Sequence, residues 1–287
     1  MEVVIIYNPV STGDSEKNAL ELADKLRAAK IAVKVRKTTH PGHGEEIAAR
    51  YAKSGKDIVL VSSSGDGGYH EVVNGALSYN SKNLIVGVLA SGNANDHSSA
   101  IGSDSLSKAI INKKFHHIDT IKVTAKVDGK AWIRYAHSYV GIGVTATAAR
   151  RLTEDRPNVI TEKWIVIKSL LSFRYVKIKE NNRVKRYSSM LFGNVDTMSK
   201  VIKLSDNSSV KDGKFEMSNI RFRSKFRLFI YLITAATVGF KHTYSLSRYE
   251  CKTLTVLPIQ LDGESYLIDS NCEVVIESVK RNLHCVL

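Results

Sequence analysis

One acidic residue stands among glycines in the stretch Ser64-Gly65-Asp66-Gly67-Gly68, directly after the strand-like segment 57–63 with its apolar residues 58–61. Glycines let a backbone turn tightly and approach a ligand without a Cβ clash. A helix predicted to begin near Tyr69 would direct its first amide groups and its dipole toward an anion. A carboxylate beside such a site can bind a bridging divalent cation or accept a proton from a hydroxyl. On these residues alone, Asp66 is equally well a turn residue or a helix cap.

Two familiar phosphate-binding patterns do not fit this stretch. The pattern G-x-G-x-x-G, started at Gly65, needs a glycine where His70 stands, and the chain has no Gly-Lys pair followed by Ser or Thr. Small polar residues do, however, also follow two other predicted strands, in 7–15 and in 89–96. Because open α/β sheets bind ligands at the carboxyl ends of their strands, these three turns predict one common binding site.

The elements that position these turns are predicted from an alternation of strand-like and helix-like segments over the first 120 residues. The alternation indicates βα units around a largely parallel sheet that is buried on both faces. The predicted strands are 2–8, 31–37, 57–63 and 84–90, and the predicted helices are 14–30, 44–55 and 69–79.

Beyond about residue 118 the sequence becomes rich in strand-like segments joined by turn signals such as Asp128-Gly129 and Asn181-Asn182. We therefore predict an α/β fold with two domains. Residues 1–120 form the N-terminal α/β domain, and residues 121–287 form a second, β-rich domain with the antiparallel arrangement of a sandwich.

The net charge, the cysteines and the longest apolar stretch of the sequence indicate which kinds of partner and which compartment to expect. The 287 residues carry a formal net charge of +14, which favours nucleic acid, anionic lipid headgroups or phosphorylated ligands without choosing among them. Three cysteines without C-x-x-C spacing suggest neither a disulfide framework nor a zinc site, so we expect a reducing cytoplasm. The longest uncharged apolar stretch, 228–240, has 13 residues, fewer than the roughly 20 that cross a bilayer.

The motifs resemble those of the diacylglycerol and lipid kinases, a family that includes bacterial lipid kinases and the sphingosine and ceramide kinases. Residues 64–75, SGDGGYHEVVNG, resemble the family signature G-G-D-G-x-x-N/H-E-V-V-N-G in its sphingosine-kinase form, with Gly68 where Thr or Leu is usual. Supporting resemblances cover most of the chain in order: NPVSTG from Asn8, VRKTTHPGHGEE with Thr38, LASGNAND with Asn93 in place of the usual Thr, and QLDGESY with its Asp-Gly-Glu.

The resemblance implies an NAD-kinase/diacylglycerol-kinase-like domain that binds ATP and Mg²⁺, followed by a β-rich domain on the lipid-acceptor side. Carried over by position, the residues that border the nucleotide are Asn8, Thr38, Ser64, Gly65, Asp66, Gly67, Gly68, Tyr69, His70 and Asn93.

The resemblance also implies catalytic and metal-binding roles. Glu264 is the proton acceptor with Asp262 beside it, and Asp66 organises the Mg²⁺-phosphate region, although Asp66 as the base is an open alternative. Asp96 and Asp119 are expected in or near the cleft. A structural Mg²⁺ is expected at Asp212, with backbone carbonyls of Ser209 and Lys214.

The sequence thus predicts an ATP-dependent lipid kinase that phosphorylates a diacylglycerol or sphingoid-type hydroxyl. We expect it to be cytoplasmic and peripherally attached to an anionic membrane surface, without a nucleic-acid partner and with a homodimer as an open option. The alternatives are an NAD kinase-like phosphotransferase and a basic, nonenzymatic module that binds nucleic acid or membranes.

Overall fold

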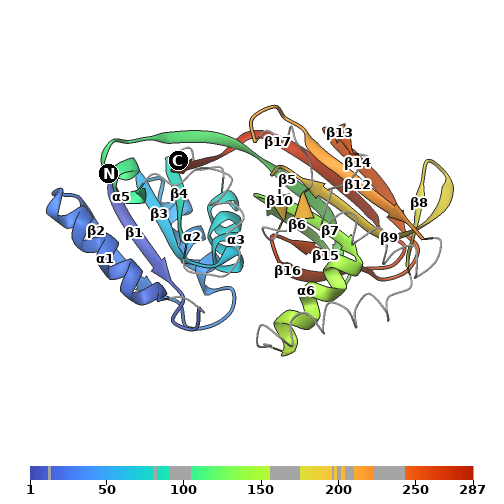
Figure 1. Cartoon of the computed structure of the whole chain (residues 1–287), viewed down its shortest axis with the longest axis horizontal. Coiled ribbons are helices and arrows are strands. Elements are labelled where there is room, and N and C mark those ends of the chain that lie inside the picture. The colour runs from blue at the N-terminus through green and yellow to red at the C-terminus, as the bar shows by residue number, and fades with distance from the viewer. Residues whose placement is uncertain are drawn as a thin grey trace. The chain divides into compact units, whose positions relative to one another are not determined.

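The computed structural model describes residues 1–11, 14–79, 83–90, 105–155, 175–195, 197–198, 202–203, 210–222 and 243–286 (Figure 1). The chain divides into two compact units, one of residues 1–120 with 280–287 and the other of residues 121–279. The sequence predicted that the first domain ends near residue 120 and contains no later part of the chain. The structure adds the last eight, because the end of β17 (Glu273–Val286) pairs with β4 (Leu84–Ala90).

The first unit contains the predicted parallel sheet, in the order β2, β1, β3, β4 and the end of β17. Its central strands are fully or almost fully buried, as expected for a sheet covered on both faces. The other strands here are β1 (Glu2–Tyr7), β2 (Ala32–Lys37), β3 (Ile58–Ser64) and the beginning of β5 (Phe115–Val127).

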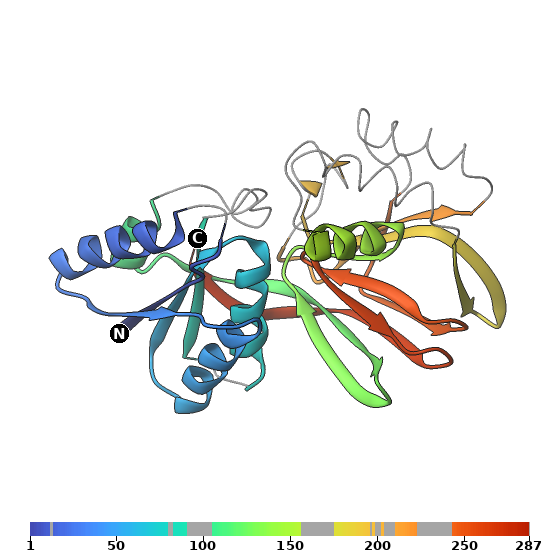
Figure 2. The ribbon, with the colours of Figure 1, turned by 90° about the horizontal axis from the view of Figure 1, so that it is seen from below.

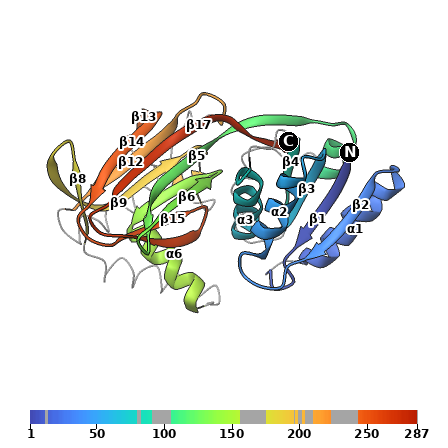
Figure 3. The ribbon, with the colours of Figure 1, turned by 180° about the vertical axis from the view of Figure 1, so that it is seen from behind.

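Helices cover the two faces of this sheet. The helices α1 (Ser15–Ala28) and α5 (Leu106–Ile111) pack on one face against alternate residues of the strands, among them Val3, Ile5, Val59 and Val61. On the other face α3 (Asp66–Leu77) packs against β3 and β4, while α2 (His43–Ser54) packs mainly against α3 (Figure 3). The α/β prediction for this unit is confirmed.

The second unit is β-rich and its strands pair antiparallel, as predicted, in the order β17, β14, β8, β9, β7, β15 and β16. One helix, α6 (Val144–Asp155), packs against β15 and β16 (Figure 2). The strands have these bounds: β6 (Lys130–Ala136), β7 (Tyr139–Gly143), β8 (Val176–Glu180), β9 (Arg183–Gly193), β10 (Thr197–Met198), β11 (Ile202–Lys203), β12 (Phe215–Arg221), β13 (Tyr244–Leu246), β14 (Arg248–Thr253), β15 (Leu257–Leu261) and β16 (Glu264–Ile268).

Two further features bear on the sequence predictions. Within the described ranges, no helix is both long and apolar enough to cross a bilayer. The apolar stretch 228–240 lies outside those ranges. Cys251, Cys272 and Cys285 are all buried, and none of these three residues is in a disulfide bond.

Candidate functional site

The β3–α3 connection has the strand–turn–helix form that the sequence predicted, but the helix begins at Asp66 rather than near Tyr69. Gly65 is the N-cap in an extended conformation, and the first intrahelical hydrogen bond runs from the Tyr69 amide to the Gly65 carbonyl at 3.2 Å. The amides of Gly67 and Gly68 therefore belong to the helix end that lacks intrahelical acceptors. Such amides are donors for a bound anion.

Asp66 is the first residue of α3 and its side chain is half-buried. Because Gly65 is the N-cap, the interpretation of Asp66 as the helix cap is wrong. A carboxylate in the first turn is favoured by the helix dipole. The same carboxylate would repel a phosphate at these amides unless a cation lay between them, so the geometry fits a Mg²⁺-bound phosphate group.

The side chain of Ser64 fills the space that a side chain at position 68 would need. A Cβ atom added at Gly68 would lie 2.6 Å from Ser64 Cβ and closer still to Ser64 Oγ. Ser64 Oγ is held there by hydrogen bonds with Ser62 Oγ at 2.7 Å and with the Gly65 carbonyl at 3.0 Å. The departure from the usual Thr or Leu at position 68 thus has a local physical reason: the serine at 64 fills the place of that side chain.

We expect Gly68→Ala to lower the free energy of unfolding by about 1–3 kcal/mol, because the new methyl group overlaps Ser64. Thermal and urea unfolding of the full chain measure this change. The control is the double variant Ser64→Gly with Gly68→Ala, which removes the overlap and should recover a coupling energy of about 0.5–3 kcal/mol. If the single substitution Gly68→Ala left the protein as stable as the parent, the two positions would not compete for space.

Two of the three predicted turns, those after β1 and after β3, lie next to one another at the carboxyl ends of the strands, and the β2–α2 connection lies beside them. The third predicted turn, in 89–96, is described only as far as residue 90. The Thr38 amide donates to the Tyr7 carbonyl at 2.9 Å, and the Asn8 amide approaches the Ser63 carbonyl at 3.5 Å. Ser63 Oγ donates to the Ser15 carbonyl at 2.7 Å. The structure therefore brings Asn8 and Thr38 together with the β3–α3 turn. Asn93 and Asp96 lie outside the described residues.

Two predicted nucleotide-bordering side chains are buried. Tyr69 is 1% exposed and His70 is 2% exposed. His70 lies within hydrogen-bonding distance of Asn74, whose Nδ2 donates to the His70 carbonyl at 3.0 Å. We therefore expect these two residues to border a nucleotide through the backbone rather than through their side chains.

Glu71 is a residue of this signature to which the sequence assigned no role. Its two carboxylate oxygens accept hydrogen bonds from the amides of Gly42 at 2.7 Å and Gly44 at 3.0 Å, at the start of α2. Gly75 lies one turn further along α3, and a Cβ atom there would come within 2.7 Å of Ala48 Cβ on α2. Glu71 and Gly75 thus hold α2 and its preceding loop against α3.

The Asp-Gly-Glu motif forms the hairpin turn between β15 and β16. Asp262 and Gly263 have φ values of 50° and 96°, the two positive values that a type I′ turn requires. Glu264 follows as the first residue of β16, paired with Leu261, and its side chain is half-buried.

The environment of Asp262 suits a structural role better than the predicted role of assisting proton transfer. Its carboxylate is 1% exposed and accepts three backbone hydrogen bonds, from His137 at 2.9 Å, Ser138 at 2.9 Å and Tyr139 at 3.0 Å. The first two amides belong to the β6–β7 connection, and the third belongs to Tyr139, the first residue of β7. Asp262 therefore joins that connection to the hairpin that carries Glu264, which makes it a positioning residue.

We expect Asp262→Asn to lower the free energy of unfolding by about 1–3 kcal/mol, because the amide nitrogen of Asn cannot accept and leaves a buried donor unsatisfied. Asp269→Asn is the matched control: Asp269 accepts from the amides of Asp128 and Gly129 at the surface of the same unit. Urea denaturation followed by circular dichroism compares the two. A larger loss in the Asp269 variant would contradict the role given to Asp262.

Asp119 is also buried, with an exposure of 0%, and accepts the Arg281 amide at 2.8 Å. The neighbouring Thr120 Oγ1 donates to Asn282 Oδ1 at 2.8 Å. These bonds join β5 to the returning end of β17 inside the first unit. Asp119 therefore has a structural role here, and its predicted place in or near the cleft stays a prediction.

Comparisons with known proteins agree with the strand–turn–helix geometry. Residues 2–123 match the family model described as the diacylglycerol kinase catalytic domain. This region belongs to the diacylglycerol kinase catalytic domain family. A search of curated proteins finds no significant match to the chain.

Solved structures resemble the whole chain, not only the kinase domain. A diacylglycerol kinase from Bacillus anthracis str. Sterne superposes with a TM-score of 0.71 at 17% identity, covering 99% of this chain and 96% of that one. A putative diacylglycerol kinase from the same source gives 0.73 at 16% identity, with the same coverage. Yeast NADH kinase complexed with NADH gives 0.55 at 12% identity, covering 100% of this chain and 83% of that one. At these identities the similarity establishes the fold.

The predicted structural metal site at Asp212 is described only in part and stays a prediction. Asp212 is exposed, and its Oδ1 accepts the Lys214 amide at 2.9 Å in a local turn. Lys211 and Lys214, both exposed, flank it. One carboxylate between two cationic residues does not make the oxygen-rich environment that Mg²⁺ requires. Ser209 lies outside the described ranges.

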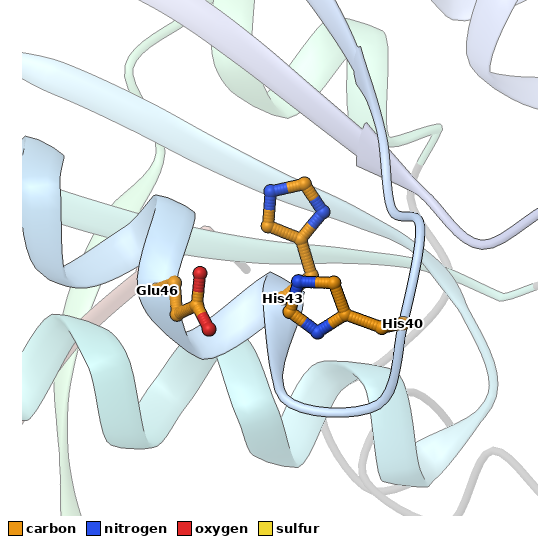
Figure 4. Close-up of side chains that lie close together, drawn as sticks. All are labelled: His40, His43 and Glu46. Carbon is orange, nitrogen blue, oxygen red and sulfur yellow. The ribbon is translucent and has the colours of Figure 1, made fainter.

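A histidine cluster in the kinase domain also fails as a metal site. Donor atoms of His40, His43 and Glu46 lie within 4.8 Å of one another at the β2–α2 connection (Figure 4). The two imidazole rings are stacked, however, with centroids 4.7 Å apart and planes inclined by 13°. Ring nitrogens bind metals in the plane of the ring, and two nearly parallel planes do not meet at one ion.

Proposed function

We propose that this protein is an ATP-dependent lipid kinase, in which a lipid hydroxyl attacks the γ-phosphoryl group of ATP to give a phospholipid or phosphorylated long-chain base and ADP. The observation that carries the proposal is the position of Asp66, at the first turn of a glycine-rich helix that follows a buried strand of a diacylglycerol kinase catalytic domain. Phosphoryl transfer depends mainly on positioning and charge neutralisation, which this turn is suited to provide.

In the first unit, the amides at the start of α3 would hold the phosphates, with Asn8 and Thr38 on the neighbouring turns. Asp66 would hold Mg²⁺, which neutralises phosphate charge when it is bound with ATP. Ser64 and Gly68 shape the backbone of this turn, and Glu71 fixes the adjacent α2 loop. The position of Asn8, Thr38 and the start of α3 at the carboxyl ends of neighbouring strands supports these assignments.

In the second unit, Glu264 would accept the proton of the lipid hydroxyl. Its hairpin is anchored by the buried Asp262, which supports a defined position for a base. We further propose that the acceptor is a lipid and that the protein attaches peripherally to an anionic membrane surface. A homodimer remains an option. The net charge of +14 supports the membrane element, because each Lys or Arg near an anionic bilayer contributes roughly 1 kcal/mol of attraction.

The test is a radiolabelled-ATP assay against a panel of diacylglycerol, a sphingoid base, ceramide and a polyprenol, with Asp66→Ala as the blank. We expect Mg²⁺-dependent labelling of at least one lipid by the parent chain and none by the blank. NAD is included because yeast NADH kinase shares the fold. Labelling of NAD with none of any lipid would replace the proposal with an NAD kinase activity, and absence of Mg²⁺-ATP binding by calorimetry would reject both.

A further inference from the structure

A hollow of about 550 Å³ lies in the first unit beside the edge strand β2. Its volume is within the range of about 300–1,000 Å³ typical of small-molecule sites. The strands contribute Glu2, Lys34, Arg36, Lys37 and Ile58, the helix α2 contributes His43, Ile47, Arg50, Tyr51 and Ser54, and the α2–β3 connection contributes Lys56. We call this feature the basic hollow.

The basic hollow exists because α2 packs mainly against α3 and not over β2. Successive side chains of a strand point to opposite faces. Val33 and Val35 pack against the α1 side of the sheet, so Lys34 and Arg36 point to the α2 side, where both are exposed. The buried residues Ile47 and Ile58 supply apolar surface beside these cations.

The charges of the basic hollow are unbalanced. Five Lys or Arg side chains and one Glu line it, which leaves an excess of four positive charges. Glu2 pairs with Lys34 at 2.6 Å and raises the pKa of Lys34, while the nearby Arg36 opposes this rise. Across the described ranges, Arg36, Lys37 and Lys56 form no ion pair. An anion in the basic hollow would therefore lie near several cationic side chains that are not neutralised by a carboxylate.

The basic hollow is lined by residues other than those assigned to the nucleotide. It reaches Glu2 and Ile58, the first residues of β1 and β3, and so extends to the amino ends of these strands. Lys37 and His43 line its other end, beside the β2–α2 connection. The nucleotide-bordering turns lie at the carboxyl ends. None of the residues predicted to border the nucleotide lines the basic hollow.

We propose that the basic hollow is a second anion site, which binds a soluble small molecule carrying at least two phosphate groups. Arg36 and Arg50 each offer a planar guanidinium group that pairs with phosphate oxygens in a bidentate manner, and Lys56 adds a further cation. Tyr51 and Ile47 provide a surface for the nonphosphate part of the ligand. The concave form suits a single small molecule better than a flat bilayer. The site does not depend on the proposed kinase activity.

The first test titrates sodium tripolyphosphate into the full chain without Mg²⁺, by isothermal titration calorimetry. The hollow variant, Arg36→Gln with Arg50→Gln, should bind at least about tenfold more weakly, because each lost charge-assisted bond is among the stronger polar contacts. The matched control is Lys17→Gln with Lys53→Gln, which removes the same charge from exposed positions outside the hollow. The control should change affinity by no more than about twofold. Equal losses in both variants would show a net-charge effect only and overturn the proposal.

The second test needs no variant and so does not depend on the folding of the hollow variant. Lysine acetylation of the parent chain, read by mass spectrometry, should show that tripolyphosphate protects Lys56, which lines the hollow. Lys53, three residues earlier and exposed but outside the hollow, should not be protected. Equal reactivity of the two lysines with and without tripolyphosphate would overturn the proposal.

A third arm separates the soluble ligand from a lipid surface. Binding to vesicles of phosphatidylglycerol and phosphatidylcholine is measured by sedimentation for the hollow and control variants. We expect the two variants to bind vesicles equally. If the hollow variant loses vesicle binding while its tripolyphosphate affinity is unchanged, the hollow is a membrane contact and the proposal is wrong.

Discussion

Asp66→Asn should lower the rate of phosphoryl transfer by about 10²- to 10³-fold, the loss typical when one group that stabilises transition-state charge is removed. The substitution keeps the size of the side chain and removes its negative charge at the first turn of α3. Because we assign Asp66 to the Mg²⁺-phosphate region, the activity of the variant should also require more Mg²⁺. Initial rates at a series of Mg²⁺ concentrations measure both effects.

Asp57→Asn is the control for this prediction. Asp57 is exposed and precedes the same strand, β3, at its opposite end. Its replacement makes the same chemical change in the same unit, away from the phosphate-binding turn, and should leave the rate unchanged. If the Asp66→Asn variant folded and kept both the parent rate and the parent Mg²⁺ requirement, Asp66 would have no part in the mechanism.

Glu264→Gln should lower kcat by about 10²- to 10⁴-fold, the usual contribution of a positioned general base. Affinity for ATP should change little, since Glu264 is assigned to the hydroxyl and not to the nucleotide. Glu273→Gln is a suitable control, because Glu273 is the exposed first residue of β17 in the same unit. Single-turnover rates and ATP titration of both variants separate catalysis from binding.

The pH dependence of these variants decides between the two candidate bases. A base must be deprotonated to act, so the parent rate should fall at low pH as the base becomes protonated. The variant that loses this acid limb identifies the base as Glu264 or as Asp66. If both variants keep the limb, neither residue is the base, and the assignment of Glu264 is wrong.

The sequence predicted the elements of the first unit well, because each is defined by local pattern. The buried strands are continuous apolar runs, and helix α1 repeats Ala19, Leu22, Ala23 and Leu26 at helical spacing. The start of α3 was misplaced by three residues. Gly67 and Gly68 look like turn residues in sequence, and only the contact of Gly68 with the Ser64 side chain shows why a glycine belongs inside the helix at this position.

The roles of acidic residues were harder to predict, because their partners are distant in sequence. Glu71 accepts from amides 27 and 29 residues earlier, and Asp262 accepts from amides more than 120 residues earlier. Local spacing contains no information about such partners. Asp262 and Glu264 belong to one motif, yet the carboxylate of Asp262 is buried and accepts backbone hydrogen bonds, whereas the side chain of Glu264 is only half-buried.

The return of β17 to the first unit has a consequence for biosynthesis. The strand that borders β4 is formed by residues close to 285, and Val286 lies against Gly87 of that strand. A ribosome adds about 5–20 residues per second. Roughly ten seconds or more therefore pass between the synthesis of β4 and that of the end of β17, which pairs with it. During this interval the edge of the nascent sheet at β4 is unpaired, and an unpaired edge strand can pair with a strand of another chain.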